Sequence, residues 1–249
     1  MNLQLQKSTI SNQQSLITIS GSKSESNRLL LLQALYPNID IENLSDSDDS
    51  MVMTEALKTT SNTIDVHHAG TAMRFLTAYF ATQRGKEIVL TGSYRMKERP
   101  IKILVDALRN LGADISYLEN EGFPPLKIKG QKLTKNKVTL KANVSSQYIS
   151  ALLLIAPKLE NGLELTLEGK ITSVPYIEMT LSLLRQIGVE TSFQGQIITV
   201  KQQSTISKQQ IVIESDWSSA SYFYSLVALS KVGTAISLSS YKETSLQGD

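Results

Sequence analysis

Two cations lie in a short segment that passes from small polar residues directly into leucines. Lys23 and Arg28 belong to GSKSESNRLLLLQAL (21–35), whose leucines at 29–32 would be apolar nearly all around a helix. We therefore expect a buried helix with polar residues at its N-terminus. The free backbone N–H groups and the positive end of the helix dipole attract anions at such an end. The segment indicates an anion site, although serine capping would explain the same residues without a ligand.

Two further segments begin with polar residues and continue into broadly apolar helices. HAGTAMRFLTAYFA (68–81) places Gly70 where a backbone N–H could approach a ligand closely. NVSSQYISALLLIAP (143–157) offers hydroxyl and amide groups at its start, on Ser145, Ser146 and Gln147. A turn or a cap would explain either segment taken alone. Three equivalent helix starts that all carry anion-binding groups favour one shared site, and DWSSASYFYSLVALS (216–230) begins a fourth such helix.

The sequence predicts no metal and no cofactor. The phosphate-binding pattern GxxxxGK[ST] is absent. His67 and His68 are the only histidines, neighbours on a strand point to opposite faces, and the chain has no cysteine. The acidic run SDSDDS (45–50) lacks the glycine and the terminal glutamate of an EF-hand, so we expect it to start a capped helix.

Composition and charge exclude several classes of protein. The net charge is only +2, which provides no broad basic field for nucleic acid. A local cluster of cations, Arg95, Lys97 and Arg99, would suit a small anion instead. No apolar run reaches the roughly 18 residues of a membrane-spanning helix, and the N-terminus shows no secretory or transit signal. We expect a soluble, cytoplasmic protein that binds neither nucleic acid nor membrane.

An internal repeat organises the helices that must position these residues. Segment 85–117 matches segment 161–193, and their Pro-started helices carry the same apolar stripe at an offset of 76, on Ile101, Val105, Leu108 and Leu111 and on Ile177, Leu181, Leu184 and Ile187. The repeating unit is a strand, a buried helix, a strand, an amphipathic helix and paired strands. We place copies at 14–66, 67–135 and 137–203, with a fourth begun at 210, which predicts an α/β fold.

Several motifs together resemble the 5-enolpyruvylshikimate-3-phosphate synthase family over nearly the whole chain. They are, in order, GSKSESNR, AGTAMR, LTGSYRMKERPI, SSQ, SVPYIEMTL and DWSSASYF. The resemblance implies two similar domains, each built from three βαβαββ units, with substrates in the cleft between them. It implies that 1–20 is a stub of the first domain, that 21–213 is the complete second domain, and that 214–249 returns to the first domain and is truncated.

The resemblance also implies the substrates and the residues that bind them. The family transfers the carboxyvinyl group of phosphoenolpyruvate to the 5-hydroxyl of shikimate 3-phosphate through a tetrahedral adduct that loses phosphate. The matching positions that bind shikimate 3-phosphate include Lys23, Ser24 and Arg28. Ser145 and Ser146 match contacts to its phosphate, Gln147 touches both substrates, and the same wall is completed by Ser173 and Tyr176.

Three positions match contacts to phosphoenolpyruvate in the family: Lys23, Gly70 and Arg99. Two of them carry the expected catalysis, because Lys23 and Arg99 offset the repulsion between the two anionic substrates. Lys23 also assists proton transfer. His68 and Phe75 differ from the asparagine and proline of many members, which affects inhibitor sensitivity rather than substrate class.

Because the family's acidic residues lie beyond this sequence, we expect the 249-residue chain to bind shikimate 3-phosphate weakly, phosphoenolpyruvate hardly at all, and to show no turnover. The full-length protein is expected to be a monomer. Two alternatives remain open: an enzyme that loads enolpyruvate onto UDP-N-acetylglucosamine, whose typical loop cysteine is missing here, and a non-catalytic anion-binding domain.

Overall fold

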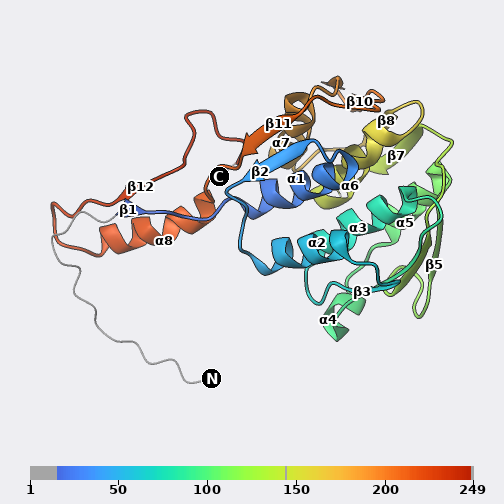
Figure 1. Ribbon diagram of the computed structural model, residues 1–249, viewed down its shortest axis with the longest axis horizontal. Helices are drawn as coiled ribbons and strands as arrows, with labels where there is room; N and C mark the ends of the chain where they lie inside the picture. Colours follow the sequence, from blue (N-terminus) through green and yellow to red (C-terminus); the bar gives the residue numbers. More distant parts are fainter. Residues whose placement is uncertain (1–15, 144, 248–249) are drawn as a thin grey trace.

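The computed structural model describes residues 16–143 and 145–247, which form a layered α/β body with an extension on one side (Figure 1). Three helices lie at the centre of the body: α1 (Lys23–Leu35), α3 (Gly70–Thr82) and α6 (Ser146–Ile155). Leucines follow one another in the sequences of α1 and α6 and are buried at every position, 29–32 and 152–154. A helix that is apolar on all sides can be stable only when protein surrounds it. The predicted buried helices are therefore confirmed.

Three outer helices surround this centre and keep one face in water. They are α2 (Asp48–Lys58), α5 (Lys102–Leu111) and α7 (Val174–Gln186). In α5, Leu104 is fully buried while its neighbour Ile103 is 40% exposed. The two kinds of helix thus differ as the apolar patterns predict. Two short helices, α4 (Tyr94–Lys97) and the 3-10 helix η1 (Ala156–Lys158), connect elements at the edges.

Two four-stranded sheets share one topology, which confirms the repeat. The first has the order β3-β4-β6-β5, from β3 (Thr63–Asp65), β4 (Glu87–Thr91), β6 (Leu126–Lys129) and β5 (Asp114–Tyr117). The second has the order β7-β8-β10-β9, from β7 (Lys137–Lys141), β8 (Leu163–Glu168), β10 (Ile197–Val200) and β9 (Thr191–Gln194). In each sheet the first pair is parallel and the other pairs are antiparallel. The hydrophobic core lies between these sheets and the central helices.

The first predicted copy, 14–66, differs from the other two. Its strand β2 (Ile39–Glu42) pairs in parallel with β11 (Gln209–Val212), so its sheet has two strands in the described part of the chain. The strand at 63–65 is β3, which pairs with β4 of the second copy. The predicted boundary between the first two copies is therefore a few residues too late, and the partner of β2 comes from the far end of the body rather than from a local hairpin.

The extension consists of α8 (Trp217–Ala228) and the parallel pair β1 (Leu16–Ile17) and β12 (Ser237–Leu238) (Figure 1). Within α8 only Ala220 is buried, and Tyr222 is 75% exposed. The expectation that 216–230 is a fourth buried helix is therefore wrong, because no layer of the body covers α8 in the described part of the chain. The chain passes between the body and the extension twice, near Gly21 and near Ser215, and an antiparallel β-bridge pairs these two residues. None of the helices in the described ranges is both long and apolar enough to cross a membrane.

Alanine substitutions will distinguish the central helices from the outer ones. Leu152, Leu153 and Leu154 on α6 are all fully buried, so replacing any of them with alanine should lower the free energy of unfolding by about 2–5 kcal/mol. On α5, Leu104→Ala should cost as much, whereas Ile103→Ala should cost less than about 1 kcal/mol. Urea denaturation measures each change. If any of the three α6 substitutions lowered the free energy of unfolding by less than about 1 kcal/mol, α6 would not be buried on all sides.

Candidate functional site

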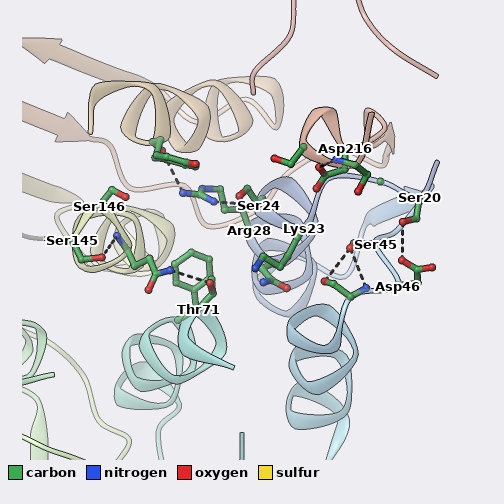
Figure 2. Close-up of a pocket in the computed structure, with 18 of the residues that line it drawn as sticks. Ser20, Lys23, Ser24, Arg28, Ser45, Asp46, Thr71, Ser145, Ser146 and Asp216 are labelled. Atoms are coloured by element: carbon green, nitrogen blue, oxygen red, sulfur yellow. Dashed lines mark hydrogen bonds between the residues drawn. The ribbon is translucent and has the colours of Figure 1, made fainter. Parts of the chain in front are cut away.

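A cavity of about 650 Å³ opens where α1, α3, α6 and α8 begin. Figure 2 shows side chains from each of these helix starts pointing toward it. Seven of the ten predicted site residues line it: Lys23, Ser24, Arg28, Ser145, Ser146, Gln147 and Tyr176. Gly70, Arg99 and Ser173 lie outside the lining, although Thr71 next to Gly70 is part of it. The structure therefore brings the three predicted helix starts together.

Arg28 is buried, with only 3% of its surface exposed, and it joins three helices through neutral partners. Its Nε donates to Thr180 Oγ1 at 2.8 Å, and its Nη2 donates to Ser150 Oγ at 2.9 Å. Nη1 donates to the Ser24 carbonyl at 2.7 Å, and Nη2 also reaches the Tyr176 carbonyl at 3.4 Å. Cζ of the guanidinium lies over the Phe75 ring, 5.6 Å from the ring centroid.

The charge of Arg28 is not neutralised by its contacts. Burial lowers the pKa of Arg28 to about 10, while Tyr176 and Glu25 act in the opposite direction, so the side chain stays cationic at neutral pH. Among the described residues, no carboxylate forms an ion pair with it. A buried charge without a counter-ion is costly, because the low-dielectric interior does not solvate it. The cavity wall therefore carries a positive charge that an anionic ligand would balance.

Lys23 adds an exposed cation at the first turn of α1. Within 16–143 and 145–247 its ammonium group has no ion pair or hydrogen bond. The preceding N-cap, Ser22, makes no side-chain capping bond, so capping does not explain the serines of this segment. At α6 the cap does form, because the Gln147 N–H donates to Ser145 Oγ at 3.3 Å. Gln147 Nε2 also donates to Thr71 Oγ1 at 3.2 Å, which ties the starts of α3 and α6.

Gly70 and Arg99 form a second cationic position beside the cavity. A Cβ atom added to Gly70 would lie 2.9 Å from Cζ of Arg99, so the absence of a side chain allows the guanidinium to rest on the first turn of α3. Arg99 is exposed, and no ion pair or hydrogen bond of its side chain appears in the described structure. Lys97, from the same predicted cluster, is instead paired with Glu119 at 2.6 Å.

Comparisons with known proteins identify the family. The family model described as EPSP synthase (3-phosphoshikimate 1-carboxyvinyltransferase) matches residues 58–249. The chain belongs to the EPSP synthase family. A 3-phosphoshikimate 1-carboxyvinyltransferase of Bacteroides fragilis strain YCH46 is 49% identical over 234 residues, which cover 94% of this chain and 57% of that protein. A 3-phosphoshikimate 1-carboxyvinyltransferase of Haemophilus influenzae strain KW20 is 42% identical over an alignment of 265 residues, which covers 94% of this chain and 60% of that protein.

Solved structures confirm the fold class of the EPSP synthase family. An EPSP synthase structure from Acinetobacter baumannii superposes with a TM-score of 0.71 and 22% identity, covering 84% of this chain and 52% of that one. The chain thus spans a little more than half the length of the relatives that it matches.

Some residues around this cavity could not be predicted from the sequence. Ser150 and Thr180 lie in apolar helix runs, where a hydroxyl is read as a tolerated core residue. Their position at the buried Arg28 could have been found only from the three-dimensional packing of α1, α6 and α7. The cavity is also lined by Ser20 and Asp216, where the chain passes between the body and the extension, and by Asp46 in the loop before α2. Asp216 caps α8 by accepting from the Ser219 N–H at 2.9 Å.

The two histidines lie at a turn rather than on a strand. His67 has a φ of 49°, and its Nδ1 lies 2.7 Å from Nδ1 of His68. The expectation that their side chains point to opposite faces is therefore wrong, because the left-handed backbone turns the two rings together. His68 Nε2 lies 3.6 Å from an Asp48 oxygen at the start of α2. The helix predicted from SDSDDS does begin there, but its N-cap Ser47 makes no side-chain capping bond, so the predicted cap is wrong. In the described residues no group of three or more histidine or acidic side chains could hold a metal ion.

Glu25 lies behind the site and is almost fully buried. Burial raises the pKa of Glu25 to about 7; Lys242 opposes this shift and Glu214 adds to it. Glu214 accepts bonds from Trp217 Nε1, the Lys242 N–H and the Ser245 hydroxyl, at 2.8, 3.0 and 2.6 Å. Glu25 accepts a long bond of 3.4 Å from Gln247 and a backbone bond from Glu214. Because burial outweighs these contacts, the pKa of the Glu25 carboxyl lies near neutral pH.

This buried carboxyl predicts a pH dependence of stability. The folded protein binds the Glu25 proton more tightly than the unfolded chain does, so the free energy of unfolding should fall as pH rises from about 4.5 to 7. Glu25→Gln should remove that slope and stabilise the protein at pH 8 by roughly 3 kcal/mol. Urea titrations at a series of pH values measure this. Glu55→Gln, at an exposed position, is the control and should leave the slope unchanged.

Proposed function

We propose that the protein transfers the carboxyvinyl group of phosphoenolpyruvate to the 5-hydroxyl of shikimate 3-phosphate, and that this chain supplies the shikimate 3-phosphate side of the site. The observation that carries the proposal is Arg28, a buried cation with only neutral partners at a cavity formed by helix N-termini. Membership of the EPSP synthase family supports the choice of substrate.

Shikimate 3-phosphate presents a phosphate, a carboxylate and hydroxyls, and the cavity offers matching donors. In our proposal Ser145 and Ser146 bind the phosphate at the positive end of α6, and Arg28 with Lys23 provides the balancing charge. Further contacts come from Ser24, Gln147, Ser173 and Tyr176. Ser173, the N-cap of α7, lies outside the cavity lining, so it would act through Tyr176 on the same helix.

Phosphoenolpyruvate would bind beside the first substrate, at the start of α3. Lys23 and Arg99 would offset the repulsion between the two anions, and Gln147 would contact both. Arg99 can bind an oxyanion through two parallel N–H groups, for which a lysine has no equivalent. The 5-hydroxyl gives up its proton as its oxygen bonds to C2 of phosphoenolpyruvate, while C3 takes up a proton and becomes a methyl group. The C2–O bond to phosphate then breaks, and loss of a proton from C3 restores the double bond. Lys23 would assist one of these proton transfers.

In the domain arrangement that we propose, 21–213 forms the substrate domain, while 1–20 and 214–249 belong to the other domain. Support comes from β11, which pairs with β2 in the body and ends at Val212, and from α8, which extends away from the body (Figure 1). Residues 1–15 lie outside the described structure. A monomeric, cytoplasmic protein without bound cofactor, nucleic acid or membrane remains our prediction.

Calorimetry with the 249-residue chain tests the substrate directly. Shikimate 3-phosphate should bind and UDP-N-acetylglucosamine should not. Lys23→Met should weaken shikimate 3-phosphate binding roughly 10- to 100-fold, because it removes a charge-assisted contact. Lys86→Met removes the same charge from an exposed loop and should have no effect. Binding of UDP-N-acetylglucosamine and not of shikimate 3-phosphate would favour the enzyme that loads enolpyruvate onto UDP-N-acetylglucosamine. Binding of shikimate 3-phosphate without turnover, even in a protein that contains this chain and a C-terminal portion, would favour a non-catalytic anion-binding domain.

A methyl group at Gly70 should separate the two substrates. Gly70→Ala places a Cβ against the Arg99 guanidinium, which must move away from the start of α3. Because the displaced group is the end of a flexible side chain, the free energy of unfolding should change little. Phosphoenolpyruvate affinity should fall about tenfold while shikimate 3-phosphate affinity stays within about twofold. Equal losses for both ligands, measured by calorimetry, would contradict the assignment of Arg99 to phosphoenolpyruvate.

A further inference from the structure

Two buried hydroxyls hold the guanidinium of Arg28 from behind the cavity. Thr180 on α7 and Ser150 on α6 are both fully buried, and their oxygens lie 2.9 Å apart. Thr180 Oγ1 accepts from Arg28 Nε, and Ser150 Oγ accepts from Nη2. Neither hydroxyl lines the cavity, so neither can contact a ligand there directly.

The direction of these hydrogen bonds follows from counting protons. Thr180 Oγ1 lies 2.9 Å from the Tyr176 carbonyl, which can only accept, so the single Thr180 proton points there. Thr180 must then accept from both Arg28 and Ser150, and the Ser150 proton points to Thr180. The lone pairs of both hydroxyls are thereby directed at the guanidinium. Arg28 donates four hydrogen bonds to described residues, which use four of its five N–H groups. One N–H group on Nη1 has no acceptor among those residues.

Arg74 provides an internal comparison, because it has the same local backbone contacts without a serine–threonine pair; its side chain meets Tyr148 instead. Its Nη1 donates to the carbonyl four residues earlier, Gly70, and its Nη2 reaches the Pro100 carbonyl at 3.5 Å. Pro100 corresponds to Tyr176 at the repeat offset of 76, and the counterpart of Thr180 is Leu104. Nε of Arg74 has no partner among the described residues, and Arg74 does not line the cavity. The hydroxyl pair thus accompanies the arginine that faces the cavity.

We propose that Thr180 and Ser150 are positioning residues for the anion site, an inference that rests on the proposed function. Neutral hydroxyls fix the Nε and Nη2 edge of the guanidinium without cancelling its charge. A carboxylate at the same place would hold the arginine equally well and would compete with the ligand for its charge. The hydroxyl pair leaves the full charge and the remaining Nη1 donor to the anionic groups of shikimate 3-phosphate.

Substitutions at Thr180 test this role through ligand affinity. Thr180→Val replaces the hydroxyl with a methyl group of similar size and should weaken shikimate 3-phosphate binding about tenfold in calorimetry. Thr180→Ser restores the hydroxyl and should bind within about twofold of the unmodified chain. The control is Thr77→Val on α3, which removes an equally buried hydroxyl that donates to the Met73 carbonyl and does not touch Arg28. Ser150→Ala serves in the same way if Thr180→Val fails to fold.

A second readout needs no ligand. In nitrogen-15 spectra, the Arg28 Nε–H signal, assigned by its loss in Arg28→Lys, should exchange slowly with water. Thr180→Val should speed that exchange at least tenfold, and Thr180→Ser and Thr77→Val should not. Unchanged exchange in Thr180→Val, or an equal loss of affinity in Thr77→Val, would overturn the inference. Failure of the unmodified chain to bind shikimate 3-phosphate would instead contradict the proposed function, while slow exchange would still report the hydroxyl support.

Discussion

A charged guanidinium is held inside this protein by groups that carry no charge. Removing Arg28 from water is costly, and the structure offsets part of that cost with hydroxyl and carbonyl oxygens and with an aromatic face. Those partners come from α1, α3, α6 and α7, so the arginine can be satisfied only when all four helices have packed. The anion site and the core of the domain are therefore parts of a single arrangement.

The pseudo-symmetry of the body explains why polar residues collect at one end. Three central helices run from a shared polar end into an apolar interior, so their free N–H groups converge on the same cavity. The outer helices and the sheets fix the spacing of those ends. The repeats have nevertheless diverged in detail: α1 contributes cations, α6 contributes hydroxyls and an amide, and α3 contributes a bare glycine against which Arg99 lies.

Local periodicity made much of this fold predictable. The buried leucines of α1 and α6 and the offset of 76 between the amphipathic helices follow from side-chain patterns within single elements. The pairing of β2 with β11 joins segments about 170 residues apart, and no local pattern encodes it. The turn at His67 depends on a positive φ that a histidine seldom adopts, and the role of Thr180 depends on which arginine it meets. The candidate residues at the starts of α1, α3 and α6 were found because those helix starts agreed, whereas Ser173 and Tyr176 were implied only by the family resemblance. The supporting residues Ser150 and Thr180 were missed because they lie in the core.

The pairing of β2 with β11 also bears on how the chain acquires its structure during synthesis. The two four-stranded sheets are each built from neighbouring segments, so they can form soon after those segments leave the ribosome. The strand beside α1 has no partner until residues 209–212 have been made, and closing so long a loop is slow. Lys23 and Arg28, although they precede both four-stranded sheets in the sequence, are thus among the last residues to reach their final surroundings.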